Sequence, residues 1–137
     1  MKYALSICLT LSILFSGCSD GSYEVVCIGG KGGDLTFIFK PQHHGVAITS
    51  TASYRDTIYV KYGTQEYPGG KPDDYDEYYV GEPGDDFIKV TNMRCGVHYI
   101  YGKGFDTSIA EVVRGGIPFI TEQQSGTIEI VVPVTED

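Results

Sequence analysis

The sequence predicts an all-β protein, a seven- to eight-stranded antiparallel sandwich that follows an N-terminal signal peptide. Three observations carry this prediction. Composition favours strands, because the 137 residues include 18 Gly and 11 Tyr, with many Val, Ile and Thr, and no Trp. Apolar and polar residues alternate cleanly over residues 35–39 and 128–134. No segment keeps a helical period of 3.6 residues, and residues 107–113 would make one helical turn at most.

The first element is an export signal over residues 1–17. Lys2 precedes an apolar run of about a dozen residues, which suits a signal-peptide core and is too short to span a bilayer of roughly 30 Å. The run ends in Phe15-Ser16-Gly17-Cys18, which resembles the lipobox of bacterial lipoproteins, although Phe15 replaces the usual Leu. The resemblance implies that Cys18 becomes the acylated first residue of the mature protein. The alternative is an ordinary secretory signal with an incidental Cys.

A very short tether is expected between the anchor and the folded domain. Residues 18–22 comprise the lipidated Cys and this tether, and residues 23–137 form one sandwich domain. Five extended residues reach at most about 17 Å, so the domain is expected close to the bilayer that holds its anchor. Asp20 resembles the surface-export signals of Bacteroidota lipoproteins. We therefore expect an outer-membrane or cell-surface location, with the periplasmic face as the alternative.

The charge of the chain argues against nucleic acid as a partner. Removing residues 1–17 takes away one of ten basic residues and none of the eighteen acidic ones, which leaves a net charge of −9. Such a surface repels phosphate backbones, and no cluster of Lys and Arg offsets the repulsion.

Short apolar segments recur along the mature domain, separated by turn residues. Pro41 is expected to end a strand or to lie at an edge, because it cannot donate to a β ladder. The glycines of residues 29–33 are expected to form a flexible connection between the first two strands, because they lack the features of a phosphate-binding loop. The expected strand segments are residues 23–28, 35–39, 46–48, 58–62, 78–80, 87–90, 97–101, 112–113, 117–120 and 128–134.

Two resemblances add to this reading. The segment of residues 86–101, with Met93, Cys95 and Gly96 before a Tyr-bearing strand, resembles the strand–Gly turn–strand signature of transthyretin-like and carboxypeptidase-regulatory-like domains. That resemblance implies an immunoglobulin-like or transthyretin-like sandwich, a fold that serves as carrier, linker or structural module.

The whole chain is also similar to small Bacteroidota lipoproteins, a likeness that implies no activity. It rests on His43-His44-Gly45-Val46, Tyr59-Val60-Lys61-Tyr62, Gly104-Phe105-Asp106 and Gly115-Gly116-Ile117-Pro118.

His43 and His44 are the most conspicuous pair of potential metal ligands. Neutral imidazoles bind copper, zinc and nickel well. Adjacent residues of a strand point to opposite faces, so this pair chelates one ion only if the backbone turns between them, and the flanking Pro and Gly favour a turn. A third ligand would come from His98, Met93 or a carboxylate. The sequence favours a polar turn without metal, and it makes Cu or Zn the alternative; no other cofactor is expected.

The segment of residues 65–80 joins an acidic cluster to three tyrosines and lacks confident regular structure. Asp73, Asp74, Asp76 and Glu77 do not have the spacing of an EF-hand, so a solvated loop is favoured over a calcium site. Tyr side chains are common at interfaces and on sugars, because they combine an apolar ring with a polar tip. Binding and packing are weighted equally for Tyr75, Tyr78 and Tyr79, whereas Tyr99 and Tyr101 are expected in the core.

Cys27 and Cys95 are the two cysteines left once the signal is removed and Cys18 is acylated. Disulfides persist in the cell envelope, so a bridge between them is one alternative. Two separate buried thiols are the other.

No catalytic signature is present, because the chain lacks a Gly-x-Ser-x-Gly elbow, a His-Glu-x-x-His motif and a Cys-x-x-Cys motif. We therefore expect a membrane-anchored, non-catalytic envelope protein that binds a glycan or a protein partner or acts as a scaffold. Its first partner is the lipid bilayer, reached through Cys18. The alternative function is a periplasmic transition-metal-binding protein that uses His43 and His44.

Overall fold

The computed structural model describes residues 26–136. The signal peptide, the expected lipidation site Cys18, the tether and residues 23–25 lie outside this range. Residues 26–28, the described part of the first expected strand, have no strand structure. Within the described range no helix is long and apolar enough to cross a membrane.

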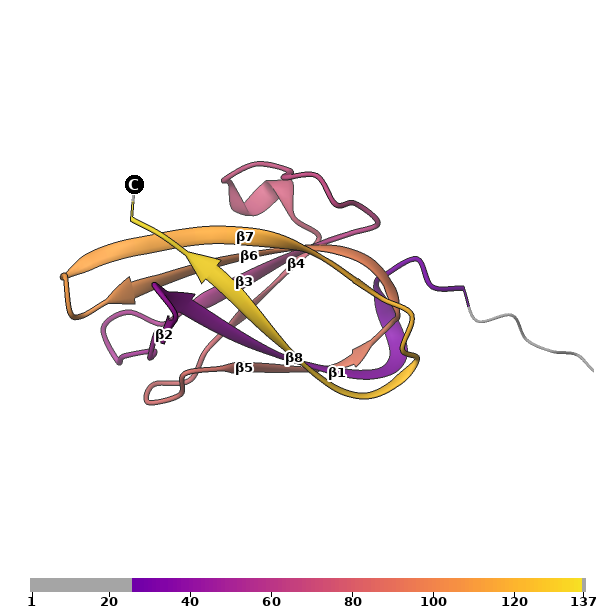
Figure 1. Ribbon diagram of the computed structural model, residues 1–137, viewed down its shortest axis with the longest axis horizontal. Helices are drawn as coiled ribbons and strands as arrows, with labels where there is room; N and C mark the ends of the chain where they lie inside the picture. Colours follow the sequence, from indigo (N-terminus) through magenta and orange to yellow (C-terminus); the bar gives the residue numbers. More distant parts are fainter. Residues whose placement is uncertain (1–25, 137) are drawn as a thin grey trace, which may run out of the picture.

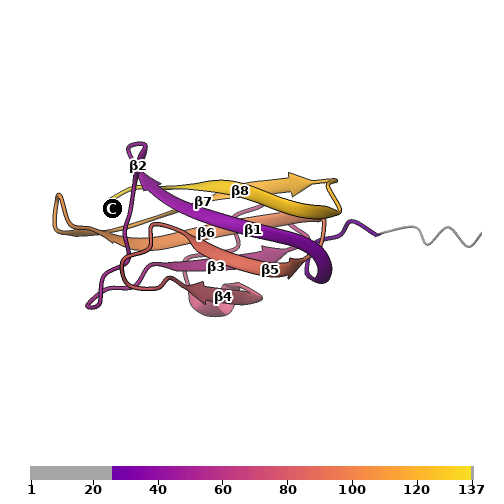
Figure 2. The same ribbon diagram turned by 90° about the horizontal axis from the view of Figure 1, so that it is seen from below.

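Eight strands in residues 26–136 form two four-stranded sheets that pack as the layers of a sandwich (Figures 1 and 2). This arrangement confirms the all-β sandwich. One sheet contains β1 (Lys31–His43), β2 (Val46–Ala47), β5 (Ile88–Met93) and β8 (Ser125–Val134). The other has the order β4-β3-β6-β7, from β3 (Thr57–Tyr62), β4 (Glu77–Val80), β6 (Gly96–Asp106) and β7 (Glu111–Thr121), and a short 3₁₀ turn, η1 (Pro72–Asp74), follows β3.

β1 is the central strand of its sheet and organises the fold. It pairs antiparallel with β2 and β5, but it pairs in parallel with β8 from Asp34↔Ser125 to His43↔Val134. A parallel neighbour requires a long crossover, and the whole second sheet lies between these two strands in the chain. The ends of β1 and β8 therefore reach the same end of the sandwich, which places the C-terminal segment beside His43.

β1 is longer than the sequence predicted at both ends. Gly32 and Gly33 belong to β1 rather than to a flexible connection. Pro41 lies inside the strand and does not end it. Its carbonyl oxygen accepts a hydrogen bond from the Ile48 amide at 3.0 Å. The nitrogen of Pro41 faces the same side, where the pairing with β5 has ended and that with β2 has not begun, so the missing donor interrupts no ladder.

The inward faces of the two sheets form the core. Leu35, Phe37 and Phe39 alternate along β1 and are fully buried against Ile58 and Val60 of the opposite sheet, among others. The ring of Phe37 lies edge-on to that of Phe39 at 5.9 Å between centroids. A Phe→Ala change at such a site costs about 3–5 kcal/mol of unfolding free energy.

β7 is one continuous strand where the sequence suggested two short ones separated by glycines. It pairs with β6 from Asp106↔Glu111 to Gly96↔Thr121. The glycines do not break the strand. They let the backbones of β7 and β8 approach closely, because a Cβ on Gly115 would lie 2.4 Å from the Pro133 carbonyl oxygen of β8. Residues 107–110 form the turn of the β6–β7 hairpin and contain no helical segment.

Cys27 and Cys95 are joined by a disulfide, with 4.6 Å between their Cα atoms. Cys27 precedes β1, and Cys95 lies between β5 and β6, where the chain passes from one sheet to the other. The amide of Gly29 donates to the Cys95 carbonyl at 2.8 Å, which adds a second link at the same place. The bridge therefore fixes the start of the described chain to the connection between the sheets.

Candidate functional site

The two histidines lie at a tight turn between β1 and β2. His44 has φ of 50° and Gly45 has φ of 80°, while His43 pairs with Val46 across the hairpin. Two consecutive positive φ values are the mark of the two-residue hairpin turn that matches strand twist, and His tolerates this region better than most residues. The turn brings the imidazole rings of His43 and His44 onto one side, with 4.2 Å between their centroids.

His43 is buried between two carboxylates from distant parts of the chain. Its Nδ1 donates to Asp106 Oδ2 at 2.7 Å, and its Nε2 lies 2.5 Å from Glu136 Oε2. Asp106 ends β6, and Glu136 follows β8. The ring therefore connects three segments at one end of the sandwich.

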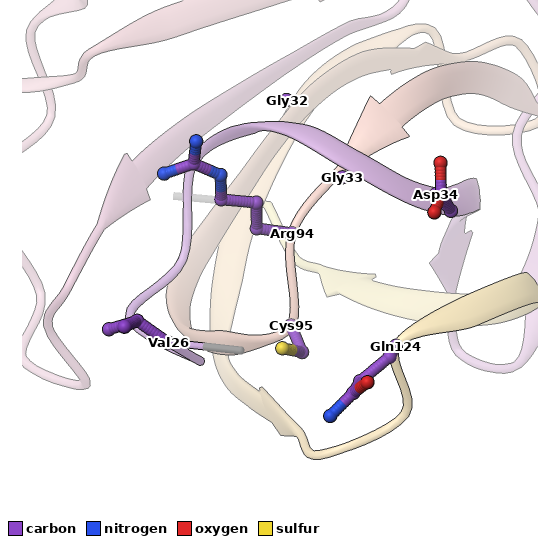
Figure 3. Close-up of a pocket in the computed structure, with 7 residues that line it drawn as sticks. All are labelled: Val26, Gly32, Gly33, Asp34, Arg94, Cys95 and Gln124. Carbon is purple, nitrogen blue, oxygen red and sulfur yellow. The ribbon is translucent and has the colours of Figure 1, made fainter. Parts of the chain in front are cut away.

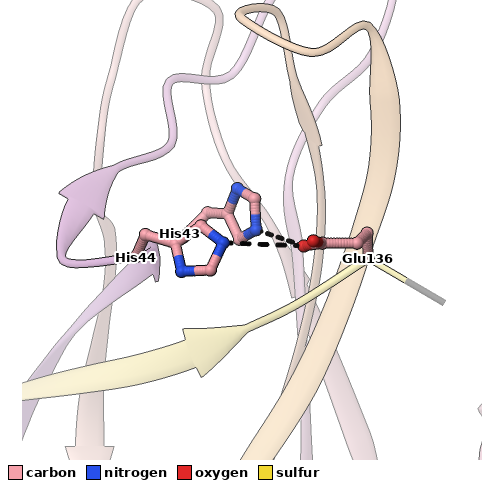
Figure 4. A group of neighbouring side chains, drawn as sticks. All are labelled: His43, His44 and Glu136. Atoms are coloured by element: carbon pink, nitrogen blue, oxygen red, sulfur yellow. Dashed lines mark hydrogen bonds and ion pairs between the residues drawn. The ribbon is translucent and has the colours of Figure 1, made fainter.

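His44 completes a three-residue group around the Glu136 carboxylate. Its Nε2 lies 3.9 Å from Glu136 Oε2, and one ligand atom from each of His43, His44 and Glu136 falls within 4.8 Å of the other two. Figure 4 shows both rings directed at the same carboxylate. The His44 side chain is 74% exposed, so it forms the open side of the group.

The electrostatics of the group favour charged side chains. The hydrogen bond to Asp106 raises the pKa of His43 despite the opposing effect of burial, and Glu136 adds to the rise. Hydrogen bonds from Ser108 and then His43 lower the pKa of Asp106 to about 2. Hydrogen bonds from its own backbone amide and from His43 lower the pKa of Glu136. These opposite shifts of the pKa values widen the pH range over which the two carboxylates and the imidazolium are charged together.

A pocket of about 410 Å³ opens beside the two histidines. Val46 and Ile48 line one part, and Phe105 and Ile109 line another, so much of its wall is apolar. Its lining residues belong to the end of β1, to β2 and the residues beside it, to the end of β6 and to the β6–β7 turn, which lie at the end of the sandwich that carries the C-terminal segment (Figures 1 and 2).

His98, one of the candidates for a third ligand, does not join this group. It lies eight residues before Asp106 on β6, at the other end of the sandwich, and is fully buried. The rings of Phe37 and Tyr62 pack edge-on against it, at 5.4 and 5.9 Å between centroids. Burial lowers the pKa of His98, and among the described residues neither ring nitrogen has a hydrogen-bond partner. Met93, the other neutral ligand considered, is also in the core.

Tyr75, Tyr78 and Tyr79 do not form one surface, and Tyr78 and Tyr79 belong to β4 rather than to the loop before it. Tyr75 is buried against the outer face of the second sheet, where its ring stacks on Tyr101 at 5.7 Å, and its hydroxyl donates to the Gly69 carbonyl at 2.7 Å. Tyr79 packs against the main core, and burial raises its pKa. Tyr78 is 65% exposed. Tyr75 therefore holds the loop onto the sheet, and Tyr78 is the ring of the three that is offered to solvent.

The acidic residues of the same loop are engaged separately. Asp74 Oδ2 accepts from the Lys71 amide at 3.0 Å, and Asp76 accepts from Lys61 Nζ at 3.0 Å. Glu77 accepts a hydrogen bond from the Tyr79 hydroxyl. These carboxylates hold local structure, and among the described residues they belong to no group of potential metal ligands whose ligand atoms come together.

A second pocket, of about 420 Å³, lies at the opposite end near Cys95 (Figure 3). Its charged lining residues are Asp34 and Arg94, which lie on different sides of the pocket in the figure. They form no group that converges on a ligand.

Comparison of the chain with protein-family models, with curated proteins and with solved structures gives no match. The geometry of the site adds Asp106 and Glu136, which the sequence did not single out. Asp106 belongs to the Gly104-Phe105-Asp106 segment, whereas no local pattern marks Glu136.

Proposed function

We propose that this protein is a lipid-anchored, non-catalytic binding protein of the cell envelope, and that its ligand is a divalent transition metal ion. The observation that supports this proposal is the convergence of His43, His44 and Glu136 on one point. Two imidazoles and one carboxylate are a ligand set that zinc and copper accept. The lipobox-like residues ending at Cys18 support the anchor.

The separations of the Glu136 carboxylate from the two imidazoles suit an ion after a small adjustment. Zinc lies about 2.0–2.2 Å from imidazole nitrogen and carboxylate oxygen, so tetrahedral ligands are roughly 3.3 Å apart. Glu136 Oε2 is 2.5 Å from His43 Nε2 and 3.9 Å from His44 Nε2. Moving this oxygen less than about 1 Å toward His44 brings both separations near the required value. Glu136 is 45% exposed, so its side chain has room to make that movement.

Asp106 would act as a positioning residue for the metal. Its carboxylate accepts the Nδ1 proton of His43, which leaves Nε2 as the nitrogen directed at the ion. Carboxylates placed behind a histidine ligand in this way fix the tautomer and the orientation of the ring, and their removal commonly costs 10–100-fold in metal affinity.

The surroundings of the group support binding rather than catalysis. Apolar and polar residues share the pocket wall, and its carboxylate, Asp106, is held by His43 and Ser108. Among the described residues no other acidic side chain lines the pocket.

Titration calorimetry of the full-length protein in detergent with Zn²⁺ tests the proposal. Wild type should bind one ion, and His44→Ala should weaken binding by more than the roughly hundredfold attached to positioning residues. His44 is exposed and has no close hydrogen bond, so its loss should lower the melting temperature by a few degrees at most, through the mild strain of Ala at a positive φ. Glu122→Gln, which neutralises an exposed carboxylate elsewhere, is the matched control. Equal zinc affinity in wild type and His44→Ala would overturn the proposal.

A second candidate function, recognition of a glycan or protein, is favoured by one observation. Tyr67 and Tyr78 are 55% and 65% exposed, and both rings border the buried tyrosine cluster on the outer face of the second sheet. Exposed rings with rigid support are effective contact groups. Capture of an envelope component by wild type, lost in Tyr67→Ala/Tyr78→Ala, is the expected result for this function.

A further inference from the structure

The metal group supplies three ligands, and the neighbouring carboxylate is not free to be the fourth. Asp106 Oδ2 is 2.7 Å from His43 Nδ1. Its Oδ1 accepts from the Ser108 amide at 2.8 Å and from the Ser108 hydroxyl at 2.6 Å. Both oxygens are therefore engaged, and residues 26–136 offer no other His, Cys, Asp or Glu to the group. A four-coordinate ion held by three protein ligands keeps one position for an outside ligand.

That position lies next to a pocket. Both His43 and His44 line the pocket beside the site, and Glu136 does not, so an ion between the three lies at the pocket rim. An outside ligand bound to the ion from the pocket side would place the rest of its body against the wall. That wall includes the apolar side chains of Val46, Ile48, Phe105 and Ile109.

The charges of the site select against an anion. A divalent ion is neutralised locally by the carboxylates of Glu136 and Asp106. No Lys or Arg lines the pocket, and the whole chain carries a net charge of −8. An anionic ligand would therefore gain little attraction at the ion and would meet long-range repulsion. A neutral donor ligand does not depend on that attraction and is not repelled.

We propose that the metal-loaded protein binds a small neutral ligand with an apolar body, whose donor atom takes the fourth position and whose body fills the pocket beside His43. This inference rests on the proposed metal site and extends it to a second ligand. The protein would then hold a metal complex rather than a bare ion.

Cobalt substitution makes the proposal measurable. Co²⁺ takes zinc sites, and its visible absorption changes when a ligand enters its coordination sphere. The full-length protein loaded with Co²⁺ is titrated with imidazole and with 4-phenylimidazole, which share the donor and differ by one apolar ring. We expect both to shift the spectrum and 4-phenylimidazole to bind about tenfold more tightly, which corresponds to roughly 1.4 kcal/mol.

Ile109→Ala is the variant that isolates the pocket. Ile109 is 43% exposed and is not a metal ligand, so Co²⁺ and imidazole should bind as in wild type, while the advantage of 4-phenylimidazole falls severalfold. If Co²⁺ binds but neither imidazole changes the spectrum, the fourth position is closed and the inference is wrong. Equal affinity for the two imidazoles would equally overturn it. Absence of any Co²⁺ spectrum would instead refute the underlying metal site.

Discussion

Asp56 is a buried carboxylate whose replacement should change the response of the fold to pH. It is 2% exposed, and among the described residues its Oδ1 has no hydrogen-bond partner. Burial raises the pKa of Asp56 from 3.8 to about 6, although hydrogen bonds from Ser50 and the Phe105 backbone oppose the rise. A Cβ on Gly104 would lie 2.7 Å from Asp56 Oδ1, so the space around this carboxylate is closely filled.

The sign of the effect follows from proton linkage. Between pH 4 and 6 the native state holds the Asp56 proton more tightly than the unfolded chain, so stability falls as pH rises. A shift of about two pKa units corresponds to at most about 3 kcal/mol of lost unfolding free energy above pH 6. Asp56→Asn removes the titration and keeps the shape. We expect the variant to lack this decrease and to be about 1–3 kcal/mol more stable than wild type at pH 7.5.

Urea unfolding of both proteins across pH 4–8 measures this difference directly. Other titrating groups, His43 included, contribute equally to both proteins, so the difference between the two curves isolates Asp56. A constant difference across the range would show that the carboxylate has an ordinary pKa and would refute the reasoning. The control Asp86→Asn alters an exposed carboxylate and should leave the pH dependence unchanged.

Three further predictions concern other parts of the molecule. Replacing Cys27 and Cys95 together with Ser should lower the unfolding free energy by about 4 kcal/mol, measured by urea unfolding, because the bridge closes a loop of about 70 residues; equal stability would contradict the bridge. Tyr75→Ala should lower the melting temperature by several degrees, whereas Tyr78→Ala should leave it unchanged, since one ring is buried and the other exposed. Mass spectrometry of the membrane fraction should show an acylated N-terminus at Cys18, and an unmodified soluble protein would contradict the anchor.

Strand periodicity predicted most of the layers of this fold. Leu35, Phe37 and Phe39 alternate because one face of β1 is buried, and the structure places all three in the core. The alternation that ends at Val134 marks β8 in the same way. The pairing of the strands could not be predicted from the sequence. The parallel neighbour of β1 is distant in the chain, and local pattern contains no information on which strand lies beside which.

The sequence predicted only part of the candidate site, again because local pattern does not show which distant segments lie side by side. His43 and His44 are conspicuous in the sequence, and the following Gly indicated the turn that brings their rings together. Asp106 and Glu136 reach them only through the β1–β8 pairing and the length of β6. The loop tyrosines show the opposite case, because composition could not tell Tyr75, which supports the loop, from exposed Tyr78.

X-ray absorption at the zinc edge of the full-length protein loaded with one equivalent of Zn²⁺ tests the metal site most directly. The site predicts two imidazole nitrogens and carboxylate oxygen at about 2.0–2.2 Å, and loss of one imidazole in His44→Ala. A spectrum with oxygen neighbours and no imidazole signal, or one that His44→Ala leaves unchanged, would contradict metal binding by His43, His44 and Glu136.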